Sequence, residues 1–339
     1  MLHATRTDSD ITTAPRSARR LGRRALLSGA VLATAALAAP AIASAADTVV
    51  APDPLADQIS ALDGTVVWVS GTFGKQKLMQ LTADGIAPVK GAPQAKSYRS
   101  IDLGRDGKNR LVLTYQRCGA SACKTLTDNL DGQRASFRHL TLKRCELTTA
   151  PARWRSRSAY GLLCRKTNNE IDQKRSGLYI KTAAGTMKRL PRPRDAAKFG
   201  ISDIASVDLR GTDVAAVIAD VYEYAFVQTT SGDKLRSIFA AASEGDSDQS
   251  ARGLALGPGG RMHVLTTAAH AGDPNLALLL RVTGTCYERE TLANPPGPEQ
   301  EVGFRANDVA VDGSTIYLVV PGVGVITHEF APAGACTPL

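Results

Sequence analysis

The sequence predicts an all-β fold, a six-bladed β-propeller of four-stranded antiparallel blades, closed by the mature N-terminal strand. Three observations predict it: two series of turns that repeat in step, four strand-like runs in each repeat, and a last repeat with too little chain for its outer strand. Self-similarity at about 40 to 50 residues with four strands per unit is typical of β-propellers. No amphipathic helix of useful length interrupts the pattern.

The segment 97–142 shows one complete unit. Its runs are rich in Val, Leu, Thr and Tyr, and Asp-Gly turns bound them. Such runs predict hairpins, and four in a row predict an up-and-down sheet. The expected strands are Ser97–Leu103, Leu111–Tyr115, Cys123–Leu126 and Phe137–Leu142.

Two series of turns extend this unit along the chain. The early series comprises Asp63-Gly64, Asp106-Gly107, a glycine-free turn near Arg157-Ser158, Arg210-Gly211, Gly259-Gly260 and Asp312-Gly313. The late series comprises Asp84-Gly85, Asp131-Gly132, Ala184-Gly185, Ser231-Gly232, Thr283-Gly284 and Ala333-Gly334. Both advance 249 residues over five steps, so the two markers share one period and define six units.

The last unit is incomplete. Only five residues follow Gly334, whereas the segment Asp47–Pro52 has no place in the first unit. We expect this N-terminal segment to complete the last blade, because closure by strand exchange removes two sheet edges and makes the array one cooperative unit.

Several of these residues resemble a known group of repeats. Asp106-Gly107 with the strand after it, and Leu178-Tyr179-Ile180 followed by Gly185, resemble the TolB-type and WD40-like six-bladed repeats. The strand end Tyr115-Gln116-Arg117-Cys118 resembles the exported actinobacterial forms. The Ser-Pro-Asp-Gly form usual in that repeat is absent, and Gly257-Pro258-Gly259-Gly260 is its nearest approach. The resemblance implies an interaction platform rather than a catalyst.

Residues 1–45 are predicted to be a signal peptide, which leaves 46–339 as a single propeller domain. Arginines precede the apolar run Ala25–Ala43, and Ala43-Ser44-Ala45 is a small-x-small cleavage site. Arg23-Arg24 before Ala25-Leu26-Leu27 favours the twin-arginine route, with a general secretory signal as the alternative. We expect a secreted or extracytoplasmic protein with no transmembrane segment after cleavage.

An even number of cysteines in an exported chain favours disulfides. The six cysteines are Cys118, Cys123, Cys145, Cys164, Cys286 and Cys336. The first two flank one hairpin loop, and the next two lie on either side of the turn near Arg157, so antiparallel pairing brings each couple close enough to bond. The last two form the third pair by elimination, provided that the C-terminal tail leaves its blade.

Charge is distributed unevenly. The chain has a formal net charge of +9, which falls to +5 without residues 1–45. Residues 134–198 carry 17 basic and 4 acidic side chains, whereas residues 199–339 carry 8 basic and 17 acidic ones. Either this is a functional polar surface or these are solvated strand faces of opposite sign. A mature charge of only +5 on an exported protein argues against nucleic acid as a partner.

The long connections are expected on one end of the propeller, where binding loops on a rigid scaffold usually lie. These connections are 165–175, 191–200, 240–252 and 291–301. The binding-face candidates on them are Arg165, Lys166, Lys174, Arg175, Arg192, Arg194, Glu244, Asp246 and Asp248. The expected partner of this monomer is a protein or a cell-envelope polymer, and the alternative is that these charges only keep the protein soluble.

The innermost strands supply few groups for catalysis. The funnel candidates are Asp102, Asp208 and Asp308, and no histidine accompanies them. A propeller enzyme needs several acids, bases or metal ligands to converge there, and no hydrolase or phosphate-loop motif occurs elsewhere. We therefore expect no catalytic residue, no metal ligand and no cofactor. The acidic loop Glu244–Asp248 leaves a bound calcium ion as an alternative.

Two further groups of residues have structural interpretations. The histidines His139, His263, His270 and His328 are expected as strand residues, with His270 and Asp273 too few to define a metal site. The run Arg153–Arg157 alternates, which predicts arginines on one strand face and Trp154 on the other. It is either a cationic stripe or a core tryptophan between solvated arginines.

These observations favour a non-catalytic binding module in the cell envelope or extracellular space. The alternative is an exported hydrolase or lyase that acts on a polysaccharide or a lactone in the propeller funnel. Whether the chain has enzymatic activity is not decided by its sequence.

Overall fold

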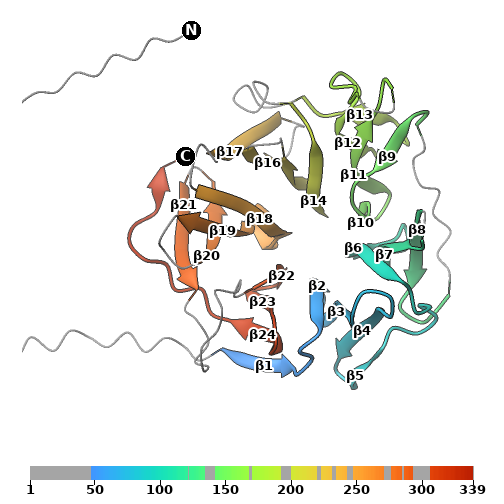
Figure 1. Cartoon of the computed structure of the whole chain (residues 1–339), viewed down its shortest axis with the longest axis vertical. Helices are drawn as coiled ribbons and strands as arrows, with labels where there is room; N and C mark the ends of the chain where they lie inside the picture. The colour runs from blue at the N-terminus through green and yellow to red at the C-terminus, as the bar shows by residue number, and fades with distance from the viewer. Residues whose placement is uncertain are drawn as a thin grey trace, which may run out of the picture. The chain divides into compact units, whose positions relative to one another are not determined.

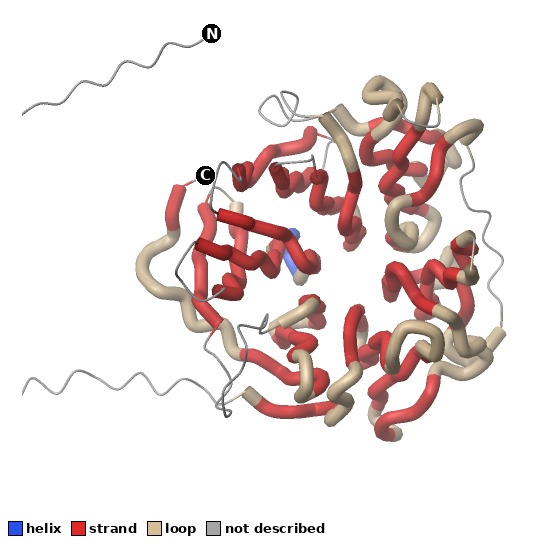
Figure 2. The backbone as a smooth tube through the Cα atoms, in the orientation of Figure 1, coloured by secondary structure: helices blue, strands red, loops and turns tan. Residues whose placement is uncertain are grey.

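Antiparallel β-strands make up nearly all of the secondary structure in the computed structural model (Figure 2). The structure describes residues 47–120, 122–133, 142–167, 170–191, 200–219, 223–230, 234–242, 247–270, 276–284, 286–292 and 306–338, all within the unit Ser44–Leu339. Their one helical element is a 3₁₀ turn, Pro258–Gly260. Nowhere in these ranges is there a helix long and apolar enough to cross a membrane. The fold is therefore all-β with several antiparallel sheets, consistent with a β-propeller.

Four sheets are built from consecutive strands. The first contains β2 (Ala56–Leu62), β3 (Thr65–Ser70), β4 (Lys77–Thr82) and β5 (Gly85–Pro88). Another contains β14 (Asp203–Arg210), β15 (Asp213–Ala219), β16 (Glu223–Thr230) and β17 (Lys234–Ala242). A third is built on β18 (Ser247–Leu256), β19 (Met262–His270), β20 (Leu276–Thr283) and β21 (Cys286–Leu292). The last is built on β22 (Asp308–Asp312), β23 (Thr315–Val320) and β24 (Gly324–His328).

The second and third predicted units join in one eight-stranded sheet. Its strands are β6 (Ser97–Arg105), β7 (Leu111–Cys118), β8 (Cys123–Asn129), β9 (Cys145–Leu147), β10 (Ala152–Trp154), β11 (Arg157–Cys164), β12 (Gly177–Lys181) and β13 (Met187–Arg189). The two halves meet at one parallel pair, Trp154 with Arg105. Gly104 allows this approach, since a Cβ there would collide with the carbonyl oxygen of Arg153. The predicted strand Phe137–Leu142 lies outside the described residues except for Leu142.

Both ends of the described chain add a strand to a sheet. β1 (Thr48–Ala51) pairs with β24, as the sequence predicts for the N-terminal segment. Gly324 is required at this junction, because its φ is +127° and a Cβ would collide with the carbonyl oxygen of Ala51. The short C-terminal strand β25 (Thr337–Pro338) instead pairs with β21. The C-terminal tail therefore leaves the sheet of β22–β24.

The three disulfides match the predicted pairs. They join Cys118 to Cys123, Cys145 to Cys164 and Cys286 to Cys336. The third is possible because β25 lies beside β21 and brings the Cα atoms of its two cysteines to 5.6 Å.

One predicted turn lies two residues earlier than expected. β10 ends at Trp154 and β11 begins at Arg157, so the run Arg153–Arg157 is not one strand. Arg155 occupies the turn with φ of 56°, and its N–H donates to the carbonyl of Arg105 at 2.7 Å. Trp154 is half-buried between the apolar clusters of two neighbouring sheets, which supports its interpretation as a core residue.

The core consists of apolar clusters between neighbouring sheets. For example, Leu178 and Ile180 of β12 pack with Ile204 of β14 and Val214 of β15. All six side chains of β3 are buried, since both faces of its sheet are covered. The inner strands β2, β6, β14, β18 and β22 surround a central cavity (Figure 1). Contacts link successive inner strands in the order β2, β6, β10, β14, β18 and β22, and β22 also contacts β2.

Candidate functional site

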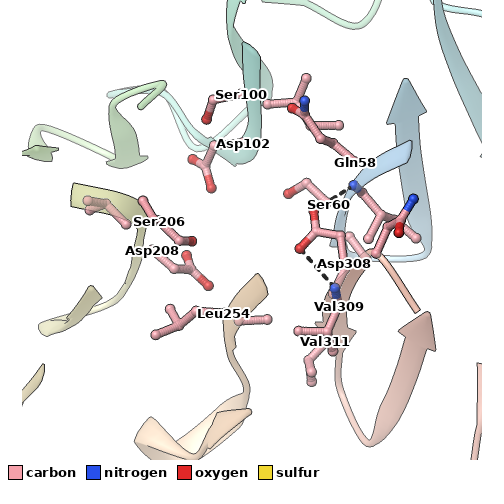
Figure 3. A pocket seen from close by; sticks show the side chains of 18 of the residues that line it. Gln58, Ser60, Ser100, Asp102, Ser206, Asp208, Leu254, Asp308, Val309 and Val311 are labelled. Atoms are coloured by element: carbon pink, nitrogen blue, oxygen red, sulfur yellow. Dashed lines mark hydrogen bonds between the residues drawn. The ribbon is translucent and has the colours of Figure 1, made fainter. Parts of the chain in front are cut away.

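A polar cavity of about 430 Å³ lies where the inner strands meet (Figure 3). The three funnel candidates, Asp102, Asp208 and Asp308, all line it. Polar neighbours include Ser100 on β6, Ser206 on β14, and Gln58 and Ser60 on β2.

The aspartates of this cavity bind the backbone of neighbouring sheets. Asp308 on β22 accepts the N–H of Ile59 on β2 at 3.0 Å. Asp208 on β14 accepts the N–H of Leu256 on β18 at 2.7 Å. Each carboxylate also accepts the N–H of its own next residue. These bonds fasten one sheet to the next.

The second and third units continue this pattern. Ser60 Oγ on β2 accepts the N–H of Leu103 on β6 at 2.9 Å, and Asp102 on β6 accepts a backbone hydrogen bond from Arg153 on β10. Four of the six junctions between inner strands thus carry a side-chain acceptor for the neighbouring backbone. We call this set, Ser60, Asp102, Asp208 and Asp308, the junction acceptors.

Arg210 extends from β14 across the cavity, and it was not identified from the sequence as a site residue. Its Nη2 donates to the carbonyl oxygens of Ala61 at 2.6 Å and of Val311 at 3.3 Å. Its Nε lies 3.8 Å from Asp208 Oδ1. The alternation of side chains along β14 places Ser206, Asp208 and Arg210 on one face, so period two was the signal that could have identified it.

Burial changes the protonation of two cavity aspartates. It raises the pKa of Asp102 well above its usual 3.8, and the Asp208 carboxylate adds to the effect while Arg210 opposes it. Burial also raises the pKa of Asp308 to about 7, although the N–H groups of Ile59 and Val309 partly oppose this. Asp308 packs so closely on β18 that a Cβ at Gly253 would collide with its carboxylate. Asp308 is therefore partly uncharged near neutral pH, and burial favours the uncharged form of Asp102 as well.

A second cavity, of about 540 Å³, lies beside the start of β9 and the end of β11. Arg144, Cys145, Glu146, Leu163, Arg165, Lys166 and Thr167 line it, and we call it the cationic pocket. Of its residues, Arg165 and Lys166 are binding-face candidates from the sequence. Arg144 and Glu146 were missed, because they lie across from the predicted loop, Arg144 in the turn before β9 and Glu146 on β9.

The cations around this pocket have defined contacts. Arg165 lies 3.4 Å from Glu146, and Lys166 lies 2.5 Å from Glu170, which raises the pKa of Lys166. Arg175 donates to the carbonyl of Lys143 at 2.9 Å, while Lys174 is exposed at the end of the same loop.

The remaining binding-face candidates have other outcomes. Arg192, Arg194, Glu244 and Asp246 lie outside the described residues. Asp248 is placed in strand β18, paired with Ala269, rather than in a loop. The predicted connection 240–252 is thus mostly strand, because β17 and β18 extend to Ala242 and from Ser247. Asp248 is therefore corrected from a loop residue to a sheet residue.

The histidines of the described chain have separate environments. His263 is buried, and burial together with Arg281 and Arg261 lowers its pKa to about 4. His328 places Nδ1 2.8 Å from Asp47 and Nε2 2.9 Å from Glu290. Burial lowers the pKa of His328, but these two hydrogen bonds raise it further, so the net direction is upward.

Metal ligands were sought among the same residues. No group of three or more His, Cys, Asp or Glu in the described ranges is arranged to hold a metal ion. Most of the acidic loop Glu244–Asp248, together with Asp273, lies outside those ranges, so the calcium alternative stays a prediction.

Comparison with known proteins gives low similarity. No protein-family model matches the chain, and no curated protein sequence matches it. Puromycin hydrolase is a similar solved structure, with 12% identity and a TM-score of 0.46 over 78% of this chain and 50% of that chain. A glucose dehydrogenase has 12% identity and a TM-score of 0.46, covering 85% of this chain and 99% of its own. A protein of unknown function from Dyadobacter fermentans has 11% identity and a TM-score of 0.47, with the same coverage.

The chain spans half the length of the puromycin hydrolase that it matches. At these identities the comparisons assign neither a family nor an activity. The resemblance to TolB-type and WD40-like repeats therefore stays a prediction.

Proposed function

We propose that this chain is an exported, disulfide-bonded β-propeller that acts as a non-catalytic binding module in the cell envelope or extracellular space. Residues 1–45 are its signal peptide, with twin-arginine export favoured, and residues 46–339 are its single domain. Three disulfides support an oxidising compartment.

Six blades closed by the N-terminal strand account best for the sheet contacts. The six inner strands contact one another in sequence order, and β22 returns to β2. The pairing of β1 with β24 combines the first and last parts of the domain in one sheet. In a closed ring every blade has a neighbouring blade on each side, so both faces of every blade are buried.

The main support for a binding function is that the junction acceptors already accept hydrogen bonds from the backbone. The three cavity aspartates are the groups that a funnel enzyme would use, and each already accepts a backbone N–H from a neighbouring inner strand. A carboxylate that holds two sheets together cannot swing toward a substrate without breaking that junction. We therefore place the working surface on the loops at the rim.

The proposed surface is centred on Arg165, Lys166, Lys174 and Arg175. Loops on a rigid scaffold are the usual place for recognition, and these four lie on one connection beside the cationic pocket. A protein or cell-envelope polymer with complementary charge would bind there with salt-sensitive affinity.

Charge reversal tests this proposal. The variant carries Arg165→Glu, Lys166→Glu, Lys174→Glu and Arg175→Glu, and circular dichroism checks its fold. The matched control reverses four exposed lysines in the first sheet and its connections, Lys75, Lys77, Lys90 and Lys96, with the same change in net charge. In pull-downs from envelope extracts, wild type and control should retain partners at low salt and release them at high salt. Equal retention by the loop variant would refute the surface.

The alternative is an exported hydrolase or lyase with its site in the central cavity. One observation favours this alternative. Asp102 is buried and has a strongly raised pKa, and a second buried aspartate, Asp208, lies close enough to contribute to that shift. A buried carboxyl with a raised pKa beside another carboxyl is a known arrangement for general acid catalysis. Turnover of a polysaccharide or lactone that is lost in Asp102→Asn would favour this function.

A further inference from the structure

The cationic pocket has features of a built anion site. We propose that it binds the phosphate groups of an anionic envelope polymer; this rests on the proposed function and names the partner's chemistry. The surrounding cations are Lys143, Arg144, Arg165, Lys166, Lys174 and Arg175, and the nearby carboxylates are Glu146, Glu170 and Asp172. Positive charge is therefore in excess.

Two arginines are oriented by neutral carbonyl groups, and neither forms an ion pair with a carboxylate of the described residues. Arg144 Nη1 donates to the carbonyl of Lys166 at 2.5 Å, and Arg175 Nη2 donates to the carbonyl of Lys143 at 2.9 Å. A guanidinium has five N–H donors, so a bond to a neutral carbonyl fixes its direction and leaves its charge and most donors for a ligand. These two bonds also link the turn before β9 to the loop after β11.

The backbone at Arg144 is unusual for an arginine. Its φ is +60°, in the left-handed region that favours glycine or asparagine. It occupies the third position of the turn Leu142–Cys145, closed by the N–H of Cys145 on the carbonyl of Leu142 at 3.0 Å. Folding alone would favour glycine here, so an arginine in this position points to a use for its side chain.

The pocket is held rigidly. The Cys145–Cys164 disulfide joins its two walls, and Arg165 N donates to the carbonyl of Arg144 at 2.9 Å next to it. Preorganised donors bind an anion with less loss of side-chain entropy.

Phosphate fits this arrangement better than carboxylate does. Cations approach from both walls, Arg144 from one and Arg165 and Lys166 from the other. A phosphodiester shares one negative charge between two non-bridging oxygens on a tetrahedral centre, so these oxygens can accept from cations on both walls, whereas the two oxygens of a carboxylate lie in one plane and point to the same side. A cavity of about 540 Å³ also has room for the sugar or polyol that carries the phosphate.

The test compares substitutions of Arg144 and Arg155, two arginines whose backbone lies in the left-handed region. Arg144→Gly removes a pocket cation and relaxes the backbone, so the variant should be at least as heat-stable as wild type. Arg155 is likewise exposed, with φ of 56°, but lies in the β10–β11 turn and donates to Asn109. Arg155→Gly therefore makes the same change in charge and backbone outside the pocket.

The measurement is binding of medium-chain polyphosphate to the mature protein at low salt, with polygalacturonate as the carboxylate polymer. We expect Arg144→Gly to weaken polyphosphate binding about tenfold, Arg155→Gly to leave it unchanged, and polygalacturonate to bind far more weakly. Equal losses in both variants, or equal binding of both polymers, would overturn the proposal. Absence of polyphosphate binding would also overturn it. The binding-module function would survive that result if envelope pull-downs still depended on the loop cations.

Discussion

Replacing Asp308 with asparagine should raise the stability of the protein relative to wild type as pH rises. The folded-state pKa of about 7 compares with an ordinary value of 3.8. That difference corresponds to about 4 kcal/mol. Because Asp308 lines the cavity and is not fully shielded from solvent, we expect about 2–3 kcal/mol in practice.

The sign follows from proton binding. Between about pH 4 and pH 7 the folded protein holds a proton on Asp308 that the unfolded chain has released. Stability from this group therefore falls as pH rises through that window and is constant above it. In Asp308→Asn the amide oxygen still accepts the N–H of Ile59 and the ionisation penalty is gone, whereas the N–H of Val309 loses its acceptor at every pH. The stability of the variant relative to wild type should therefore rise by about 2 kcal/mol between pH 4.5 and pH 8.

The assay is urea unfolding followed by circular dichroism at pH 4.5, 6 and 8, with disulfides intact. Asp308→Ala separates the two roles of this residue, because it leaves the Ile59 N–H without an acceptor and should cost about 1–3 kcal/mol relative to Asp308→Asn at every pH. Asp312→Asn is the matched control, since Asp312 accepts the N–H groups of Asp63 and Gly64 at the more exposed end of the same junction. A wild-type advantage over Asp308→Asn that grows with pH would refute the reasoning.

Three more outcomes are expected. Deletion of residues 46–53 removes β1 and the Asp53 acceptor of Trp68 Nε1, and should lower the melting temperature by about 10 °C in a thermal scan; an unchanged value would contradict closure by β1. His328→Gln should cost most below about pH 6.5 and progressively less as pH rises through the raised folded-state pKa, as measured by unfolding across pH 5.5–9. Replacing Cys286 and Cys336 with serine should destabilise by about 4 kcal/mol for a loop of 50 residues, measured by denaturant unfolding.

The repeat was predictable because each unit is local. Asp-Gly turns and alternating runs depend on neighbours in the sequence, so most of the strands and the first two disulfides follow from spacing, whereas the third disulfide was predicted by elimination. The short last unit likewise predicted that the N-terminal segment pairs with β24. The turn at Arg155 was misplaced because it contains no glycine, and Asp248 was misplaced because chain length alone does not show where a hairpin ends.

The candidate sites depend more on tertiary structure. Asp102, Asp208 and Asp308 were funnel candidates because they lie on the predicted innermost strands, but the sequence did not show that neighbouring backbones already occupy them. The crossing of Arg210 to β2 and β22 links residues more than 100 positions apart, which spacing cannot show. Arg144 was missed because an arginine in a left-handed turn has no sequence signal.

We propose that the protein binds its polymer without cleaving it, and one experiment measures both binding and cleavage. Purified mature protein is incubated with isolated envelope polymer, and the bound fraction and the polymer's chain length are determined from the same sample by sedimentation and size-exclusion chromatography. We predict binding at low salt, release at high salt and an unchanged chain length. Shortening of the polymer by wild type, abolished in Asp102→Asn, would contradict the account.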